Sequence, residues 1–207
     1  MKFYLSSIGF GNDITRLKAL LPSESSIGHI INAQDLSDVK QTRPNLQKNE
    51  IEQLIGFGFN AEPLDLRSYF GEEQKLKEKL FHLDGVWITG GNTFVLRQAM
   101  KLSGFDIIFY ELRQRHNFLY GGYSAGICVL CDSLKYIQNC DDPYFFPYKA
   151  NSEVIWEGLK VFNYGLLPHY KSRPYGSKAM KKDVKACMDN KWLFKVLRDG
   201  EVIIIDE

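Results

Sequence analysis

Short runs of apolar and β-branched residues alternate along this chain with longer stretches that show helical spacing of apolar residues. The strand-like runs lie at 2–7, 26–33, 86–88, 118–121, 166–167, 193–197 and 202–205. The helix-like stretches lie at 45–57, 72–83, 93–102, 105–117 and 177–188. This alternation predicts an α/β fold with a mainly parallel sheet flanked by helices on both faces. In such a sheet, functional groups gather at the carboxyl ends of the strands.

Length and composition narrow the class of protein. With 207 residues, 44% of them hydrophobic and 25% charged, we expect a single globular domain over residues 1–207. The formal net charge of +1 argues against a nucleic-acid binder. No apolar run approaches the roughly 20 residues that span a bilayer, and the first residues lack the apolar core of a secretory signal. We therefore expect a cytoplasmic protein with reduced cysteines and no nucleic-acid or membrane partner.

The sequence Gly-Tyr-Ser-Ala-Gly at 122–126 ends one strand-like run and precedes another apolar run. A sharp strand-to-helix turn at this G-x-S-x-G pattern would present the Ser124 side chain at its tip. Ser124 is then a candidate nucleophile, and the backbone N–H of Ala125 a candidate oxyanion donor at a helix N-terminus. The alternative is a glycine-rich turn in which Ser124 only caps the helix.

A second glycine turn, Gly-Gly-Asn-Thr-Phe at 90–94, follows the strand-like run at 86–88. Backbone at Gly90 and Gly91 can approach a ligand closely, and the N–H of Gly91 is a candidate second oxyanion donor. The alternative is a tight turn in which Asn92 or Thr93 caps the next helix.

The four histidines differ in where they stand relative to the strands. His82 and His116 precede strand-like runs, and His29 lies inside one. Only His169 follows a strand-like run directly, which places it at the same edge of the sheet as Ser124. His169 is therefore the candidate general base.

A histidine base needs a carboxylate to fix its tautomer and to stabilise the imidazolium. Asp199 follows the strand-like run at 193–197, whereas Asp141 and Asp142 follow the helix that begins after Ser124. Asp199 gives the chain order Ser–His–Asp, and either of the others gives Ser–Asp–His, as in α/β-hydrolases. Asp199-Gly200 is also typical of a hairpin turn, so these alternatives stay open.

Two further patterns have simple interpretations. Residues 171–198 contain nine basic and two acidic residues, which fits a solvated helix face or, as the alternative, a surface that captures an acidic substrate. Cys128 and Cys131 form C-x-x-C within an apolar run and without a second pair, so we expect small core residues. We expect no metal and no organic cofactor.

The chain resembles the peptidase E family of serine peptidases, which includes the α-aspartyl dipeptidases and is related to the cyanophycinases. The resemblance covers nearly the whole chain and lies in four motifs in this order: GGNTF at 90–94, GYSAG at 122–126, DDP at 141–143 and PHY at 168–170. It implies a flavodoxin-like fold similar to that of class I glutamine amidotransferases, with serine in place of their cysteine.

The resemblance also implies roles for single residues. It makes Ser124 the nucleophile, His169 the base, and Gly91 with Ala125 the oxyanion donors. We take Gly90 and Asn92, in the same turn as Gly91, as further candidate substrate-binding residues. Asp199 stands where the aspartyl dipeptidases have a glutamate before a glycine, and Asp141 matches an aspartate that has also been given a catalytic role. The aspartyl dipeptidases bind the acidic side chain of their substrates with an arginine a short way after the histidine. Residues 176–182 are the nearest equivalent here, and they contain no arginine, so Lys178 or Lys181 is the candidate substitute.

We therefore expect a serine hydrolase that cleaves small peptides, including aspartyl dipeptides, through an acyl-enzyme, as a monomer or homodimer. Two alternatives remain open on the sequence. One is an esterase or amidase on the same fold, and the other is an amidotransferase-like binding protein without turnover.

Overall fold

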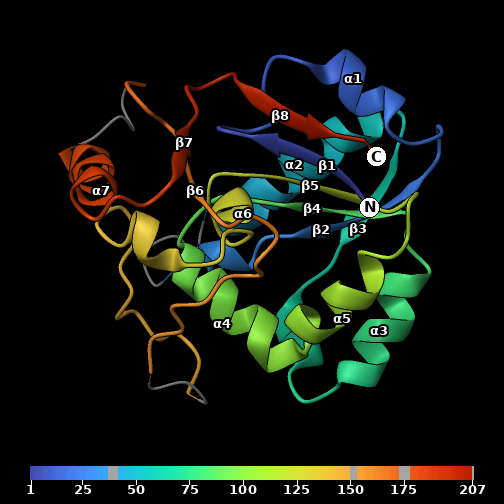
Figure 1. The fold of residues 1–207 in the computed structure, drawn as a ribbon. Helices are drawn as coiled ribbons and strands as arrows, with labels where there is room; N and C mark the ends of the chain where they lie inside the picture. The colour runs from blue at the N-terminus through green and yellow to red at the C-terminus, as the bar shows by residue number, and fades with distance from the viewer. Residues whose placement is uncertain (37–41, 150–152, 173–177, 207) are drawn as a thin grey trace.

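The computed structural model describes residues 1–207 except 37–41, 150–152, 173–177 and 207. Its main sheet has the strand order β3-β2-β4-β5-β1-β8 (Figure 1). The strands are β1 (Lys2–Ser6), β2 (Ser26–Ile30), β3 (Asn60–Pro63), β4 (Gly85–Ile88), β5 (Leu119–Tyr123) and β8 (Val202–Ile205). All neighbours pair in parallel except β8, which runs antiparallel to β1 at one edge. The predicted, mainly parallel α/β sheet is confirmed.

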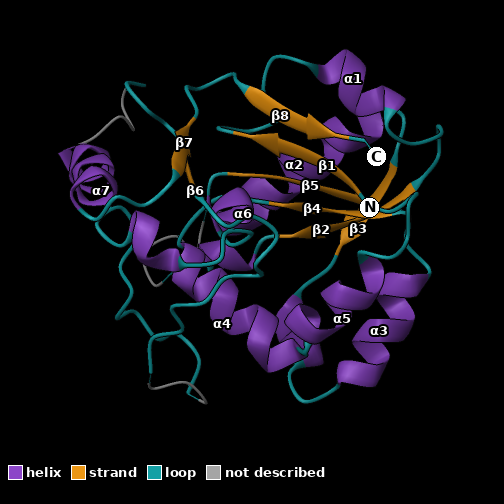
Figure 2. Cartoon of the chain, in the orientation of Figure 1, coloured by secondary structure: helices purple, strands orange, loops and turns teal. Residues whose placement is uncertain are grey.

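Helices cover both faces of this sheet (Figure 2). The helices are α1 (Ile14–Ala19), α2 (Arg43–Gly56), α3 (Glu73–Phe81), α4 (Thr93–Ser103), α5 (Phe105–Leu112), α6 (Ala125–Cys128) and α7 (Lys178–Asp189). Alternate residues of β1 show how the two layers form: Phe3 and Leu5 face the core under α3, α4 and α5, and Tyr4 faces the core under α1 and α2. Successive strand side chains point to opposite faces, so a central strand buried on both sides is apolar throughout.

A second, two-stranded sheet lies beside the main one and next to α7 (Figure 1). It consists of β6 (Gly165–Leu167) and β7 (Phe194–Val196), which pair in parallel. Since β7 pairs with β6 and β8 pairs with β1, these two strands do not form a hairpin in the described chain. The hairpin alternative for Asp199-Gly200 is therefore wrong.

One strand and one α-helix of the structure were not expected from the sequence. Strand β3 has the sequence Asn-Ala-Glu-Pro and is mostly exposed at the sheet edge, so it lacks the apolar alternation that marks a strand. Helix α1 has six residues, of which only Leu17 is buried. The strand-like run at 26–33 is also shorter than expected, because residues 32–34 form a 3₁₀ turn. No helix among the described residues is both long and apolar enough to cross a membrane.

Candidate active site

Ser124 stands at a sharp turn between β5 and α6. Its backbone has φ 51° and ψ −114°, a conformation that L-residues seldom adopt and that the surrounding structure must hold in place. Helix α6 packs closely against β4 here, because a Cβ on Gly126 would lie only 2.5 Å from the carbonyl oxygen of Ile88. The predicted strand–turn–helix at G-x-S-x-G is present, with Ser124 at its tip.

Three side chains form a continuous line of hydrogen bonds. The Oγ of Ser124 lies 3.1 Å from Nε2 of His169, and Nδ1 of His169 lies 2.7 Å from Oδ1 of Asp199. His169 follows β6 and Asp199 follows β7, and the parallel pairing of Leu167 with Val196 brings these two strand ends together. The structure thus brings Asp199, rather than Asp141, to the predicted base.

Two serines hold the histidine and its carboxylate in place. The hydroxyl of Ser7, just after β1, accepts a hydrogen bond from the backbone N–H of His169 at 2.8 Å and donates one to Asp199 Oδ1 at 3.0 Å. The backbone N–H of Asp199 donates to Ser172 Oγ at 2.9 Å. Sequence reasoning missed both serines. Ser7 lies 192 positions from Asp199, and no local pattern marks such a pairing.

The glycine turn after β4 lies beside Ser124. Gly91 has φ 148°, and a Cβ there would lie 2.3 Å from the carbonyl oxygen of Ala33, so only glycine fits. The side-chain amide of Gln34 donates a hydrogen bond to the carbonyl of Gly90 at 2.6 Å, which also holds this turn in place. Ala125 is the first residue of α6, where a backbone N–H has no acceptor within the helix. The oxyanion roles of Gly91 and Ala125 stay predictions.

Asn92 is a helix cap. Its Oδ1 accepts hydrogen bonds from the N–H groups of Phe94 and Val95, and its Nδ2 donates to the carbonyl of Asp142. Both polar atoms of the side chain are therefore engaged within the protein. The expectation that Asn92 binds substrate is not supported, and the capping alternative is confirmed.

Asp141 lies at the N-terminus of α4. Its Oδ2 accepts hydrogen bonds from the backbone N–H and the Oγ1 of Thr93, at 2.8 and 2.6 Å. Burial raises the pKa of the Asp141 carboxyl to about 6, although the two bonds from Thr93 oppose this shift. Asp141 lines the same cavity as Ser124, so it borders the candidate site without being part of the hydrogen-bonded line.

A buried cluster of polar side chains connects the two strand ends that lead into the glycine turns. Glu50, on α2, accepts hydrogen bonds from Tyr123 at 2.6 Å and from Thr89 at 2.7 Å, and His29 lies 2.8 Å from the same carboxyl group. Thr89 directly precedes Gly90, and Tyr123 directly precedes Ser124. One carboxyl group thus links the ends of β4 and β5. No sequence motif pointed to Glu50, which looks like any other charged residue of an amphipathic helix.

The other histidines lie away from Ser124, as predicted. His29 is fully buried inside β2, and His82 caps α3 with Nδ1 bonded to the carbonyl of Glu78. His116 lies before β5, at the amino end of that strand. His169 is thus the only histidine of the described chain that reaches the nucleophile.

Lys178 does not lie in the site. It is the exposed first residue of α7 and does not line the cavity around Ser124, because its side of the helix faces solvent. Met180, two residues further on, is buried and lines the cavity instead. The expectation that Lys178 binds substrate is therefore not supported. The start of the basic tract also includes residues 173–177, which lie outside the described residues.

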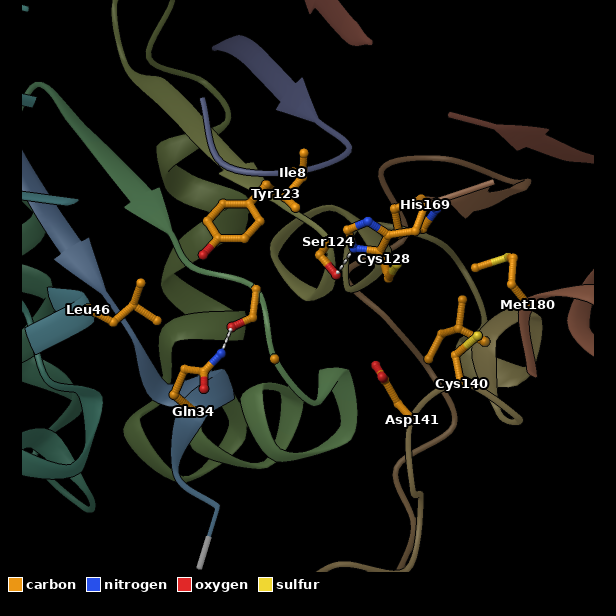
Figure 3. Close-up of a pocket in the computed structure, with 14 residues that line it drawn as sticks. Ile8, Gln34, Leu46, Tyr123, Ser124, Cys128, Cys140, Asp141, His169 and Met180 are labelled. Carbon is orange, nitrogen blue, oxygen red and sulfur yellow. Dashed lines mark hydrogen bonds between the residues drawn. The ribbon is translucent and has the colours of Figure 1, made fainter. Parts of the chain in front are cut away.

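The cavity around Ser124 has a volume of about 570 Å³ (Figure 3). Gln34, Leu46 and Tyr123 lie on one side of Ser124, and Cys140, Asp141 and Met180 lie on the other. No group of three His, Cys, Asp or Glu side chains among the described residues is arranged to hold a metal ion. Cys128 and Cys131 are buried in the core, as predicted, and Cys128 also reaches the cavity wall.

Similarity to proteins of known structure supports the fold. A "Putative Peptidase E Protein" from Listeria monocytogenes EGD-e superposes with a TM-score of 0.74 at 22% identity, over 100% of this chain and 98% of the other. A peptidase from an acI-B1 actinobacterium superposes with a TM-score of 0.69 at 14% identity, over 99% and 82% of the two chains. At these identities the comparison shows a shared fold.

Similarity in sequence is more specific. Uncharacterized peptidase Lmo0363 of Listeria monocytogenes is 33% identical over 123 residues, which are 59% of this chain and 56% of the relative. Uncharacterized peptidase Lin0382 of Listeria innocua is 35% identical over 92 residues, 44% and 42% of the two chains. The match thus spans about half the length of these curated relatives. The model of peptidase family S51 matches residues 41–207, which include all four motifs, and this chain belongs to that family.

Proposed function

We propose that this protein is a serine peptidase that hydrolyses small peptides through an acyl-enzyme on Ser124. The observation that carries this proposal is the unbroken line from Ser124 Oγ to His169 Nε2 at 3.1 Å and from His169 Nδ1 to Asp199 at 2.7 Å. These contacts have the geometry and order of a nucleophile, a general base and an orienting carboxylate. Membership of family S51 agrees with this function.

In the first half of the reaction, Ser124 Oγ attacks the carbonyl carbon of the scissile bond while its proton passes to His169 Nε2. Asp199 holds the proton on Nδ1 and stabilises the imidazolium that forms. The negative charge on the former carbonyl oxygen is stabilised by the N–H groups of Gly91 and Ala125 and by the N-terminus of α6.

The tetrahedral intermediate then collapses as the C–N bond breaks. His169 gives its proton to the leaving amine, and the acyl group stays on Ser124 as an ester. Water attacks this ester with His169 again as the base, which releases the acid and restores Ser124. The two serines that contact His169 and Asp199 keep the imidazole in one orientation through both halves of the cycle.

A dipeptide-library hydrolysis screen tests the proposal, with Ser124→Ala as the blank. The variant exchanges one small turn residue for another, so circular dichroism should show an intact fold. We expect the wild-type protein to release amino acids from a subset of dipeptides and the variant to release none above background. Equal turnover by a folded Ser124→Ala variant would contradict the proposal, and so would a wild-type protein that cleaves no peptide.

A further inference from the structure

One wall of the cavity around Ser124 is made of apolar and sulfur-bearing side chains. It consists of Cys128, Ile137, Cys140 and Met180, and we call it the sulfur wall. Cys128, Ile137 and Met180 are only 4%, 2% and 3% exposed, so close packing fixes their positions. Cys140 is exposed and also lines the cavity. In Figure 3 the labelled Cys140 and Met180 lie on the His169 side of Ser124.

The thiols of this wall are neutral. Burial raises the pKa of Cys128 well above its ordinary value. Burial also raises the pKa of Cys140, and the nearby carboxyl of Asp183 adds to that shift. A protonated thiol behaves as a small apolar group. At neutral pH the sulfur wall therefore offers apolar contact and no charge.

Asp141 carries the only carboxyl group among the described residues that line the cavity, and it disfavours binding of a negatively charged ligand. The pKa of Asp141 is raised to about 6, mainly by burial, so its surroundings penalise a carboxylate. The same surroundings would penalise a carboxylate of the substrate. Above pH 6 the ionised Asp141 would also repel it.

No lysine or arginine among the described residues lines the cavity to compensate for that penalty. Asp183 adds a second carboxyl group behind the wall, where it accepts hydrogen bonds from the backbone N–H groups of Asn139 and Cys140. Among the described residues, the sulfur wall therefore combines an apolar surface with two nearby carboxyl groups, those of Asp141 and Asp183.

We propose that the sulfur wall receives an uncharged, apolar side chain of the peptide substrate, so that leucine or methionine is preferred there to aspartate. This inference rests on the proposed peptidase function and narrows its substrate class. It also reverses the expectation of an acidic substrate that the basic tract at 171–198 suggested. Within that tract, the side chain of Lys178 is exposed to solvent, while Met180 on the same helix lines the cavity.

The test measures kcat/KM for two matched dipeptide sets, X-Ala and Ala-X, with X as leucine, methionine, asparagine, aspartate or lysine. In one of the two sets we expect leucine and methionine to exceed aspartate by at least about tenfold, since one or two buried methylene groups give discrimination of this size. Asparagine, which matches aspartate in shape, separates the effect of charge from that of size.

Variants of α7 supply the control. Met180→Lys places a cation on the sulfur wall, and Met188→Lys makes the same change on the same helix at a position that is 66% exposed. We expect Met180→Lys to lower the leucine-to-aspartate ratio of kcat/KM at least about tenfold, and Met188→Lys to leave it unchanged. Cys140→Lys changes an exposed residue of the same wall and should shift the ratio in the same direction, even if Met180→Lys does not fold.

The possible outcomes distinguish a failure of the apolar preference from a failure of the proposed peptidase function. Turnover in which aspartate or lysine equals or exceeds leucine in both sets would overturn the apolar preference and leave the peptidase function standing. An unchanged ratio in folded Cys140→Lys and Met180→Lys would overturn the role of the sulfur wall. A wild-type protein without any turnover, and with Ser124 unreactive, would overturn both.

Discussion

The candidate site has two halves that stand on different scaffolds. Ser124 and the glycine turn extend from β5 and β4, which are central, parallel strands buried along nearly their whole length. His169 and Asp199 extend from β6 and β7, a two-stranded sheet whose β7 is partly exposed. The first half is held by close packing of backbone, as at Gly91 and Gly126. The second half is held by hydrogen bonds to and from the hydroxyl groups of Ser7 and Ser172, which single substitutions can remove.

Hydrogen bonds of Ser7 join the two halves of the candidate site. Ser7 stands at the end of β1 in the main sheet, and its hydroxyl bonds to the backbone of His169 and to the carboxyl of Asp199. The contact between Ser124 and His169 also links catalytic side chains of the two halves. Substitutions in the second half should therefore change catalysis while the main sheet stays folded.

The largest expected effect is the loss of the base. His169→Ala should lower kcat by several orders of magnitude, up to about 10⁶, because nucleophile and base act as a unit. His82→Ala is the matched control, since His82 lies on α3 away from Ser124. The check is kcat on one cleaved dipeptide. A rate that survives in His169→Ala but is abolished in His82→Ala would show that the second half has been placed wrongly.

The next largest expected effect compares the two carboxyl groups near Ser124 by the loss of kcat when each is replaced. Asp199→Asn keeps the shape of the side chain but favours the wrong tautomer of His169, so kcat should fall by as much as about 10⁴. Asp141→Asn should cost less, because Asp141 bonds to Thr93 and not to the base. Steady-state kinetics of both folded variants decides the order, and the reverse ranking would transfer the orienting role to Asp141.

Asp141 should also make stability depend on pH. A pKa that folding raises from 3.8 to about 6 means that the folded state disfavours the charged carboxyl. This penalty is absent below pH 4, grows between pH 4 and 6, and is complete above pH 6, where it reaches at most about 3 kcal/mol. We expect the free energy of unfolding of wild type, relative to Asp141→Asn, to fall across this range in urea titrations. A difference that stays constant from pH 4 to 7 would contradict the buried, perturbed carboxyl.

The smallest effect tests the link between the halves. Ser7→Ala removes a hydrogen bond to Asp199 and another from His169, which should lower kcat by about tenfold. Ser6→Ala is the neighbouring control, since the Ser6 hydroxyl donates to the carbonyl of Ile8, two residues further along the chain. Similar rates for the two variants would mean that packing alone holds the second half.

The two halves also differ in how far the sequence predicts them. The turn at Ser124 and the turn at Gly91 were predictable, because a glycine-rich turn between a strand and a helix is a local pattern. His169 was predictable from its place after a strand. The choice between Asp199 and Asp141 was not, because it depends on β6 and β7 pairing in parallel, and each of these strands has only three residues.

The residues that hold the catalytic side chains and the cavity wall in place could not be predicted from the sequence, for a related reason. Ser7, Glu50 and Asp183 all bond to partners far away in the sequence, and each belongs to a residue type that is common on surfaces. The binding role expected for Lys178 finds no support, because charge in a tract does not show which side of a helix faces the cavity. On α7 that side carries Met180, together with Asp183 and Cys187, which are buried.

The central claim is that Ser124 is a nucleophile activated by His169. The most direct measurement is the intact mass of the protein after reaction with a fluorophosphonate, followed by peptide mapping of the adduct. We expect one adduct on Ser124 in the wild-type protein, none in Ser124→Ala, and a much slower reaction in His169→Ala, because the base that accepts the proton of Ser124 Oγ is gone. A wild-type protein that remains unlabelled, or labelling that proceeds equally fast without His169, would contradict the account.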